Sequence, residues 1–231
     1  KGGRNGVQAE RMCDRVVVPT DQIVLHLKAV EHHFATRPVF ANVSASFRGG
    51  QVGIVTGTNG SGKSTLFRII AGLLTPTSGA VELLLAGKPQ NSFERRPYIG
   101  LVAPDLTLYR ELTAVENLTF FAEVMGKSIG RTELGELLTE VGLKGRGRDL
   151  VGNYSSGMRQ RLKYALALLS DPPLLLLDEP TANLDTAGIA MVERLVERQR
   201  ERTGGGLTLV ATNEPRELEW GEVQVRLEPR Q

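Results

Sequence analysis

A glycine-rich stretch holds the first residues whose types and spacing could do chemistry. The segment GTNGSGKST follows an apolar run and precedes a helix-like run, and it matches the pattern G-x-x-x-x-G-K-[ST]. In such a loop the backbone N–H groups point at phosphate oxygens, the lysine supplies a compact charge, and the next hydroxyl can ligate Mg²⁺. A glycine-rich turn with a chance lysine is the alternative, which the flanking elements disfavour. The predicted nucleotide-binding residues of this loop are Gly57, Thr58, Asn59, Gly60, Ser61, Gly62, Lys63, Ser64 and Thr65.

Two carboxylates follow a continuous apolar run in the segment LLLLDEP, residues 174–180. Such a run predicts a strand covered on both faces, and open α/β sheets bind ligands at the carboxyl ends of their strands. Asp178 is predicted to hold Mg²⁺ together with Ser64, and Glu179 to polarise the attacking water. Because two carboxylates repel a triphosphate, a cation is required, and Mg²⁺ is predicted together with the nucleoside triphosphate. A solvated acidic turn at a strand end is the weaker alternative.

A third segment, YSSGMRQR, places small polar residues at the start of a predicted helix, residues 154–161. Ordinary helix capping explains the serines, since a serine hydroxyl accepts a hydrogen bond from a first-turn N–H group. A helix N-terminus also attracts anions through its free N–H groups and its dipole. Local sequence does not decide between these two interpretations.

The order of the three segments resembles the ATP-binding cassette (ABC) ATPases, the motor subunits of ABC transporters. The resemblance extends from about Gln22 to the end of the chain. It implies that the third segment is the signature motif, usually L-S-G-G-Q, which binds the γ-phosphate of ATP held by a second cassette. Two positions of that motif, Ser156 and Met158, depart from the usual residues but leave the backbone donors intact. The signature residues are then Tyr154, Ser155, Ser156, Gly157 and Met158.

The same resemblance assigns roles to two further residues. Phe34 stands where an aromatic residue usually stacks on adenine, although a core aromatic at a strand end is an alternative. Asp185, in TANLD, stands in the loop that links two nucleotide sites across a dimer, and it is also a good helix N-cap. The two roles of Asp185 are compatible.

Two positions depart more seriously from the family. Pro104 replaces a glutamine that usually contacts Mg²⁺ at the junction with the helical subdomain, and the neighbouring Asp105 is predicted to supply a hard oxygen ligand instead. Asn213 replaces a histidine near the γ-phosphate. An amide donates a hydrogen bond but carries no positive charge, so hydrolysis is predicted to be slow. The predicted catalytic residues are Glu179, Lys63 and Asn213.

Strands alternate with helices along most of the chain, which predicts an α/β fold with a parallel core. By resemblance this is a P-loop NTPase of ABC type, with a mostly parallel sheet, an antiparallel β subdomain and an inserted helical subdomain at about 106–155. The predicted domains are a flexible tail, 1–20, and a nucleotide-binding domain, 21–231. A helix is predicted from Ser64 to Leu73.

Composition excludes several classes of protein. Of the 231 residues, 41% are hydrophobic and 23% are charged, which is typical of a globular domain. The formal net charge of +2 gives no support for a nucleic-acid partner, and the single cysteine rules out a disulfide within the chain. No run of 18 or more apolar residues is present. The predicted location, peripheral at the cytoplasmic face of the cell membrane, follows from the resemblance.

The resemblance implies an ATPase that powers transport. Its predicted partners are separate transmembrane permease subunits and a second ABC cassette, identical or different, and the sequence is most similar to multidrug and heme exporters. Three alternatives remain open. A degenerate regulatory cassette would bind ATP with little hydrolysis; an ABC ATPase acting on DNA or ribosomes would usually carry a coiled coil, a zinc insert or two cassettes; a P-loop kinase would leave the third segment without a role.

Overall fold

The computed structural model describes residues 23–228, and the predicted tail, 1–20, lies outside them. The strands in order are β1 (Val24–Phe34), β2 (Arg37–Arg48), β3 (Val52–Thr56), β4 (Ser78–Leu85), β5 (Lys88–Gln90), β6 (Ile99–Val102), β7 (Leu174–Asp178), β8 (Leu207–Ala211) and β9 (Val223–Arg226). The α-helices are α1 (Lys63–Ile70), α2 (Ala114–Val124), α3 (Arg131–Glu140), α4 (Ser156–Leu168), α5 (Thr186–Glu201) and α6 (Pro215–Leu218). Within the described range no helix is both long and apolar enough to cross a membrane.

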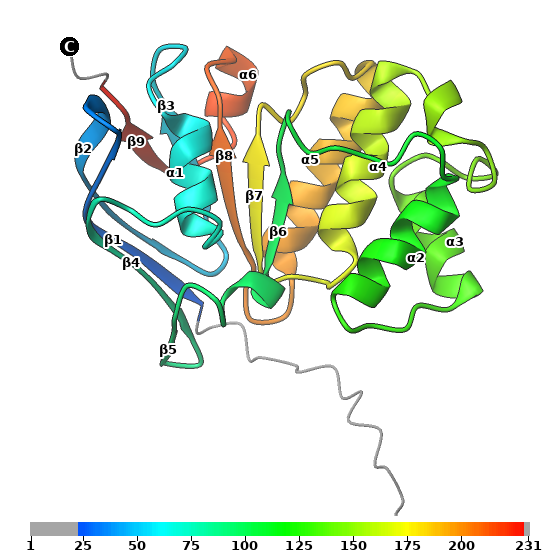
Figure 1. The fold of residues 1–231 in the computed structure, drawn as a ribbon, viewed down its shortest axis with the longest axis horizontal. Helices are drawn as coiled ribbons and strands as arrows, with labels where there is room; N and C mark the ends of the chain where they lie inside the picture. The colour runs from blue at the N-terminus through cyan, green and yellow to red at the C-terminus, as the bar shows by residue number, and fades with distance from the viewer. Residues whose placement is uncertain (1–22, 229–231) are drawn as a thin grey trace, which may run out of the picture.

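The centre of the molecule is a five-stranded sheet in the order β6-β7-β8-β3-β9, with all neighbours parallel. All five residues of β7 are buried, because α1 covers one face of the sheet while α4 and α5 cover the other (Figure 1). Alternate leucines of β7 therefore enter different cores: Leu174 and Leu176 lie on the α1 side, and Leu175 and Leu177 on the α4 and α5 side. The apolar run thus forms the doubly covered parallel strand that the sequence predicts.

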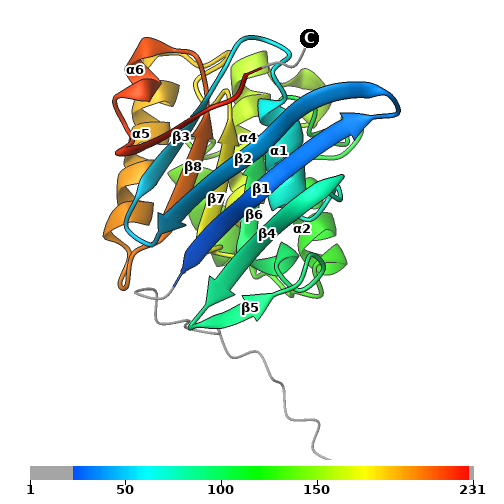
Figure 2. The same ribbon diagram turned by 90° about the vertical axis from the view of Figure 1, so that its left-hand side faces the viewer.

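A second, antiparallel sheet in the order β2-β1-β4-β5 lies on the far side of α1 (Figures 1 and 2). Phe40 and Phe47 of β2 pack into the same core as Leu66 and Ile70 of α1. The fold class is confirmed: a parallel core sheet, an antiparallel sheet and an inserted group of helices.

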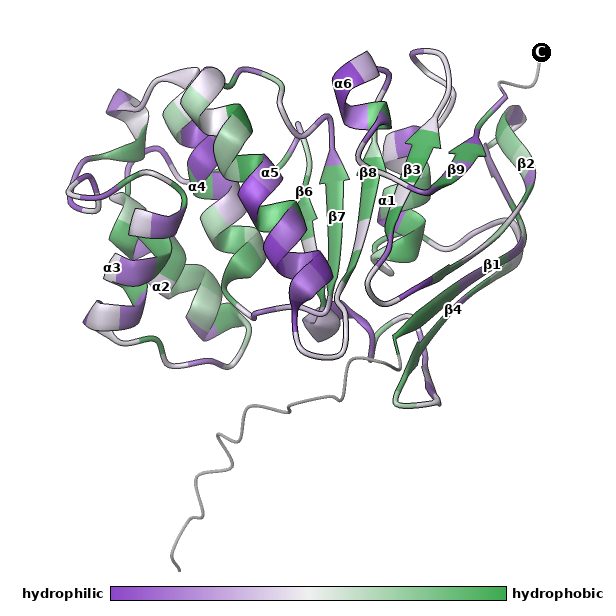
Figure 3. Cartoon of the chain, turned by 180° about the vertical axis from the view of Figure 1, so that it is seen from behind, coloured by the Kyte–Doolittle hydropathy of each residue, from purple (hydrophilic) through white to green (hydrophobic). Residues whose placement is uncertain are grey.

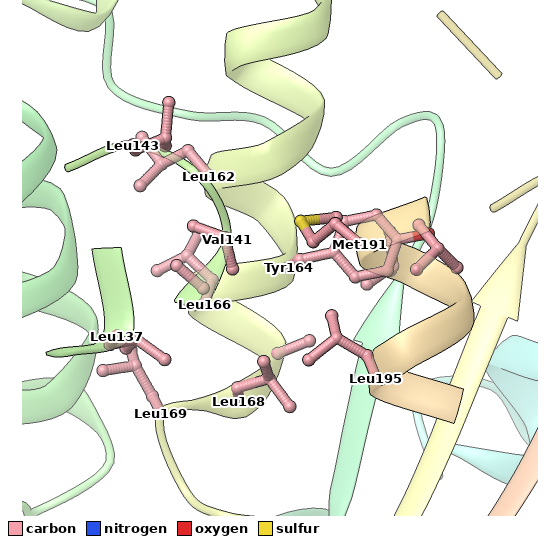
Figure 4. Packing of buried hydrophobic residues seen from close by; sticks show 14 of the residues in the cluster. Leu137, Val141, Leu143, Leu162, Tyr164, Leu166, Leu168, Leu169, Met191 and Leu195 are labelled. Atoms are coloured by element: carbon pink, nitrogen blue, oxygen red, sulfur yellow. The ribbon is translucent and has the colours of Figure 1, made fainter. Parts of the chain in front are cut away.

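The helices α2 and α3 are inserted between β6 and α4, at one end of the sheet (Figure 1). Thr113 and Glu116 form a capping box that fixes the start of α2. The helix α4 packs between this insertion and α5, with Leu162 and Leu166 near Val141 and with Tyr164 near Met191 (Figure 4). The outer face of α5 is largely hydrophilic, whereas the strands behind it are hydrophobic (Figure 3).

The prediction for the first helix is wrong at its end. The helix α1 ends at Ile70, three residues before the predicted Leu73. Gly72 has φ 72°, a left-handed conformation that stops the helix, and a Cβ there would lie 2.1 Å from the Ser92 carbonyl oxygen. The short strands β5 and β6 and the single-turn helix α6 were not predicted.

Candidate nucleotide site

The loop between β3 and α1 is built on glycines in unusual conformations. Gly57, Gly60 and Gly62 have φ values of 147°, 82° and 97°, a region that L-residues rarely adopt. A Cβ on Gly62 would lie 2.5 Å from Val39 of β2, so a larger residue is excluded by space as well. Gly62 is the N-cap of α1 and provides no side-chain cap, which leaves the first-turn N–H groups available to an anion.

Lys63 lies at the centre of this loop. Its Nζ donates hydrogen bonds to the carbonyl oxygens of Gly57, at 2.7 Å, and Thr58, at 3.4 Å. The side chain is buried, so the ammonium group is held over the loop rather than released into solvent. The arrangement places one fixed positive charge where the N–H groups converge, as phosphate binding requires.

Asp178 has the properties of a metal ligand. It is 2% exposed, and its Oδ2 atom has no hydrogen-bond partner among the described residues. Burial raises the pKa of Asp178, and a hydrogen bond from Ser64 partly offsets that rise. A buried carboxylate oxygen without a partner, next to a hydroxyl, fits a Mg²⁺ ion that also takes phosphate oxygens as ligands.

Glu179 follows Asp178 in a left-handed conformation, with φ 50°. Its N–H group donates to the carbonyl oxygen of Ala211 at the end of β8, which holds the backbone in this turn. The side chain lines a cleft of about 450 Å³ together with Lys63 and Ser64. Strained backbone of this kind is common at functional sites, where the surrounding structure maintains it.

Phe34 lies in the same cleft as the phosphate loop. The ring is 52% exposed and makes an edge-on contact with His32, with ring centroids 4.7 Å apart. An exposed flat ring in the cleft of the phosphate loop suits a purine base. Adenine stacking on Phe34 stays a prediction.

The signature segment opens a different cleft. Ser155 is the N-cap of α4, and its hydroxyl accepts a hydrogen bond from the Met158 N–H group at 3.1 Å. Tyr154 is buried and donates to the carbonyl oxygen of Arg146; burial raises its pKa to about 12. A Cβ on Gly157 would lie 3.1 Å from the carbonyl oxygen of Asn183, so a small residue is favoured here.

This second cleft has a volume of about 480 Å³ and shares no lining residue with the cleft of the phosphate loop. Its walls include four of the five signature residues. Tyr154, the fifth, is buried behind them. Asp185, Asn183, Arg146 and Arg161 also line the cleft.

Asp185 combines two contacts in this cleft. Its Oδ1 atom accepts hydrogen bonds from the Gly188 N–H group, at 2.8 Å, and from Arg161, at 2.7 Å. The Gly188 N–H group and Arg161 together lower the pKa of Asp185. The first contact caps α5 as predicted, and the second ties the start of α5 to α4.

A family model described as "ABC transporter" matches residues 40–182. The chain belongs to the ABC transporter family. YdbJ of Bacillus subtilis, an uncharacterized ABC transporter ATP-binding protein, is 37% identical over 197 residues, which are 85% of this cassette and 63% of the relative. CcmA of Xanthomonas campestris, a cytochrome c biogenesis ATP-binding export protein, is 38% identical over 176 residues, which are 76% and 80%.

Solved structures agree with this assignment. A dimeric post-hydrolysis state of an ATP-binding cassette, bound to ADP and Pi, superimposes with a TM-score of 0.75 at 26% identity, and the match covers 88% of this chain and 94% of that one. The ATP-binding subunit of another ABC transporter gives a TM-score of 0.75 at 28% identity and covers 89% and 86%. The chain spans less than two thirds of the length of the first two curated relatives, 63% and 59%.

Asn213, which stands where the family usually has a histidine, contacts the phosphate loop directly. Asn213 Oδ1 accepts a hydrogen bond from the Gly57 N–H group, and Asn213 Nδ2 donates to Asn59 Oδ1, both at 3.3 Å. The structure therefore places Asn213 beside the loop, in agreement with its position in the sequence. Its effect on turnover stays a prediction.

Asp105 lies elsewhere. Its Oδ2 atom accepts a hydrogen bond from Arg68 of α1 at 2.7 Å, and Asp105 does not line the cleft with Ser64. Lys163 of α4 donates to the carbonyl oxygens of Ala103 and Pro104 at 3.0 and 2.6 Å. A role for Asp105 as a Mg²⁺ ligand requires it to exchange Arg68 for the metal, and it stays a prediction.

Sequence reasoning missed two arginines that the structure brings into the clefts. Arg37 lines the cleft of the phosphate loop, and Arg161 lines the signature cleft. Neither arginine is part of a recognised sequence motif. For Arg161 the signal is its place in the second turn of α4; for Arg37 it is the turn Ala35–Thr36, which sets Arg37 directly opposite Phe34.

Proposed function

We propose that this cassette is the ATP-hydrolysing subunit of an ABC exporter, and that two cassettes dimerise around ATP on separate transmembrane subunits. The observation that carries the proposal is the separation of the two clefts within one chain. The cleft at the signature segment and the cleft at the phosphate loop have no lining residue in common. A nucleotide at the phosphate loop is therefore contacted by a signature segment only if a second cassette supplies it. The dimeric cassette with ADP and Pi among the structural neighbours supports this arrangement.

In the proposed reaction the glycine loop and Lys63 would hold the β- and γ-phosphates, and Ser64 with Asp178 would hold Mg²⁺. Bound Mg²⁺ would neutralise charge on the phosphate oxygens. The Glu179 carboxylate accepts a proton from water as the water oxygen bonds to the γ-phosphorus. The bond from that phosphorus to the β–γ bridging oxygen breaks, which leaves ADP and inorganic phosphate.

The surface near α2 supports docking to a membrane subunit. Four apolar or aromatic side chains here have exposed fractions between 38% and 69%: Tyr109, Phe120, Val124 and Met125. Tyr109 and Phe120 stack edge to face, with centroids 5.1 Å apart. Exposed apolar side chains that lie together mark interaction sites in soluble domains. We assign this surface to the transmembrane partner, which would place the cassette peripherally at the cytoplasmic face of the membrane.

A second function, a regulatory cassette that binds ATP with little hydrolysis, is favoured by Asn213 and Pro104. Asn213 cannot carry positive charge, and Pro104 offers no side-chain ligand. The intact Lys63, Asp178 and Glu179 favour hydrolysis instead. We retain the exporter ATPase as the proposed function.

Light scattering on the Glu179→Gln variant, with and without Mg-ATP, tests the proposal. The amide cannot accept the proton from water, so the ATP-bound dimer should persist and the mass should double. Turnover should fall by about 10²- to 10⁴-fold, whereas Glu136→Gln, an exposed control on α3, should leave it unchanged.

Adding Ser155→Arg to the Glu179→Gln variant should abolish the dimer while ATP still binds each monomer. Binding without any dimer would contradict self-association and leave a different partner cassette or the regulatory function. Equal turnover of wild type and Glu179→Gln would contradict the ATPase assignment.

A further inference from the structure

We propose that Arg37 is a nucleotide-binding residue of this cassette that contacts the ribose and α-phosphate of the bound nucleotide. The inference rests on the proposed location of ATP in the cleft of the phosphate loop. It adds a second cation to that cleft, outside the phosphate loop and on a different structural element, the β1–β2 hairpin.

The hairpin sets Arg37 beside the predicted adenine platform. The strands β1 and β2 are joined by Ala35 and Thr36, and Phe34 pairs directly with Arg37 across the turn. Ala35 has φ 51°, the left-handed conformation that closes such a tight turn. Directly opposed residues of an antiparallel pair project to the same face, with Cβ atoms about 5 Å apart. Phe34 and Arg37 therefore face the cleft together, and both line it.

The other end of this segment of β2 lies against the phosphate loop. Val39 and Phe40 occupy the space that a Cβ on Gly62 would need, at 2.5 and 2.7 Å. Arg37 precedes Val39 by two residues, roughly 7 Å of extended strand. The hairpin end lies at the same end of the molecule as the start of α1 (Figures 1 and 2). Arg37 thus lies between the aromatic platform and the phosphate loop, where the sugar and first phosphate of a nucleotide fall.

The guanidinium group of Arg37 is not committed to the protein. Within residues 23–228 it makes no hydrogen bond or ion pair, whereas Arg95 and Arg96 near α1 donate to the carbonyl oxygens of Ile69 and Gly72. Among the described residues, Glu179 is the one acidic residue lining the cleft, and the proposed reaction uses it to activate water. An exposed arginine whose guanidinium donors meet no acceptor within residues 23–228, opposite a flat ring, is suited to a phosphate oxygen or ribose hydroxyl.

The test compares Arg37→Gln, Arg37→Lys and the matched surface control Arg131→Gln, which replaces an exposed arginine on α3. The dissociation constants of ATP and ADP are measured at low and high salt. We expect Arg37→Gln to weaken both nucleotides by the same factor, about tenfold, because both carry the ribose and the α-phosphate. The loss should shrink at high salt, since screening weakens an exposed charge contact. Arg37→Lys should recover part of the affinity, and KM for ATP should rise with the dissociation constant.

Two outcomes would overturn the assignment. The first is an affinity for both nucleotides equal to that of Arg131→Gln; the second is a loss for ATP alone, which would place the contact at the γ-phosphate. Lys63→Ala separates this failure from failure of the proposed function. If Lys63→Ala binds ATP as well as wild type does, the nucleotide does not occupy the phosphate loop, and both proposals fall. If only Lys63→Ala weakens binding, the site stands and the role of Arg37 falls.

Discussion

The two clefts of this cassette are built in opposite ways. The phosphate-loop cleft relies on left-handed glycines and a buried lysine, with the buried Asp178 next to Ser64, whereas the signature cleft is formed by an ordinary N-cap, small residues and charged side chains. A buried charge without its ligand costs stability, and a left-handed backbone admits few residue types. The first cleft therefore tolerates little change, while the second keeps its backbone donors even with Ser156 and Met158 in place of the usual residues.

The largest effect should come from Asp178→Asn, which should lower activity and raise stability at the phosphate-loop site. Activity with Mg-ATP should fall at least about a hundredfold, because a metal ligand worth several kcal/mol is weakened. Stability should change in the opposite direction. Since burial raises the pKa of Asp178, the folded state binds its proton more tightly than the unfolded state does.

Wild-type stability without nucleotide should therefore decline as pH rises through the pKa of folded Asp178, and Asp178→Asn should remove this decline. Thermal unfolding at several pH values provides the measurement. The variant should melt a few degrees higher than wild type at neutral pH and show a smaller difference in acid. A variant less stable than wild type at neutral pH would show that the carboxylate is well solvated or paired, and the contrast between the clefts would fail.

The second test makes the same substitution in both clefts. Gly62→Ala forces a Cβ into a residue at φ 97° and against Val39, so the free energy of unfolding should fall by about 1–3 kcal/mol and ATP binding should be lost. Gly157→Ala meets the Asn183 carbonyl oxygen at 3.1 Å within a helix, where alanine is otherwise favourable. It should leave monomer stability and ATP binding near wild type and weaken the ATP-dependent dimer.

Denaturant unfolding, nucleotide titration and light scattering on the two variants give the comparison. Equal loss of ATP affinity in both would mean that the signature residues act on the nucleotide of their own chain. Equal loss of stability would mean that Gly157 is as constrained as Gly62.

The third test concerns Asn213, which contacts the phosphate loop through both ends of its amide. We expect wild-type turnover below about 10 per second, the usual enzyme range. Asn213→His should raise kcat by about tenfold and introduce a dependence on a group that titrates near pH 6.5, because imidazole can carry charge and relay a proton. The measurement is the pH profile of kcat. Wild-type turnover already in the ordinary range would contradict the predicted penalty.

The sequence predicts those parts of the molecule whose functional residues lie together in a short local motif. The glycine loop and the apolar strand ending at Asp178 are fixed by neighbouring residues, so spacing identifies them, whereas the serines at the start of α4 gain a functional role only through the family resemblance. The end of α1 was missed because Gly72 stops the helix inside an apolar run. The strand β6 has only four residues, including a glycine, too few for a periodic signal.

Contacts between residues that are not part of one motif are harder to predict from the sequence. Arg37 enters the cleft because the hairpin places it opposite Phe34, and Asp105 pairs with an arginine of α1 from another part of the chain. The turn Ala35–Thr36 is only a weak signal for the first contact, and the second leaves no pattern in the sequence because it depends on how α1 packs against the chain after β6. Local patterns and the family resemblance therefore identified the phosphate loop and Phe34, Glu179 and Asn213 beside it, but not Arg37, which the hairpin brings to the same cleft.

The smallest effect should come from Asp105→Ala. The carboxylate pairs with Arg68 at 2.7 Å on an exposed surface, and such pairs contribute about 0.2–1 kcal/mol to the free energy of unfolding. If Asp105 only pairs with Arg68, Asp105→Ala should cost stability of that size and leave the Mg²⁺ concentration for half-maximal ATPase activity unchanged, since Lys63, Ser64 and Asp178 are untouched. Asp105→Asn, which keeps the shape and an oxygen but loses the charge, is the matched control. A raised Mg²⁺ requirement in both variants would show instead that Asp105 leaves Arg68 to ligate the metal, as its position beside Pro104 suggests. The metal site would then extend from the phosphate-loop cleft to the exposed Asp105–Arg68 pair.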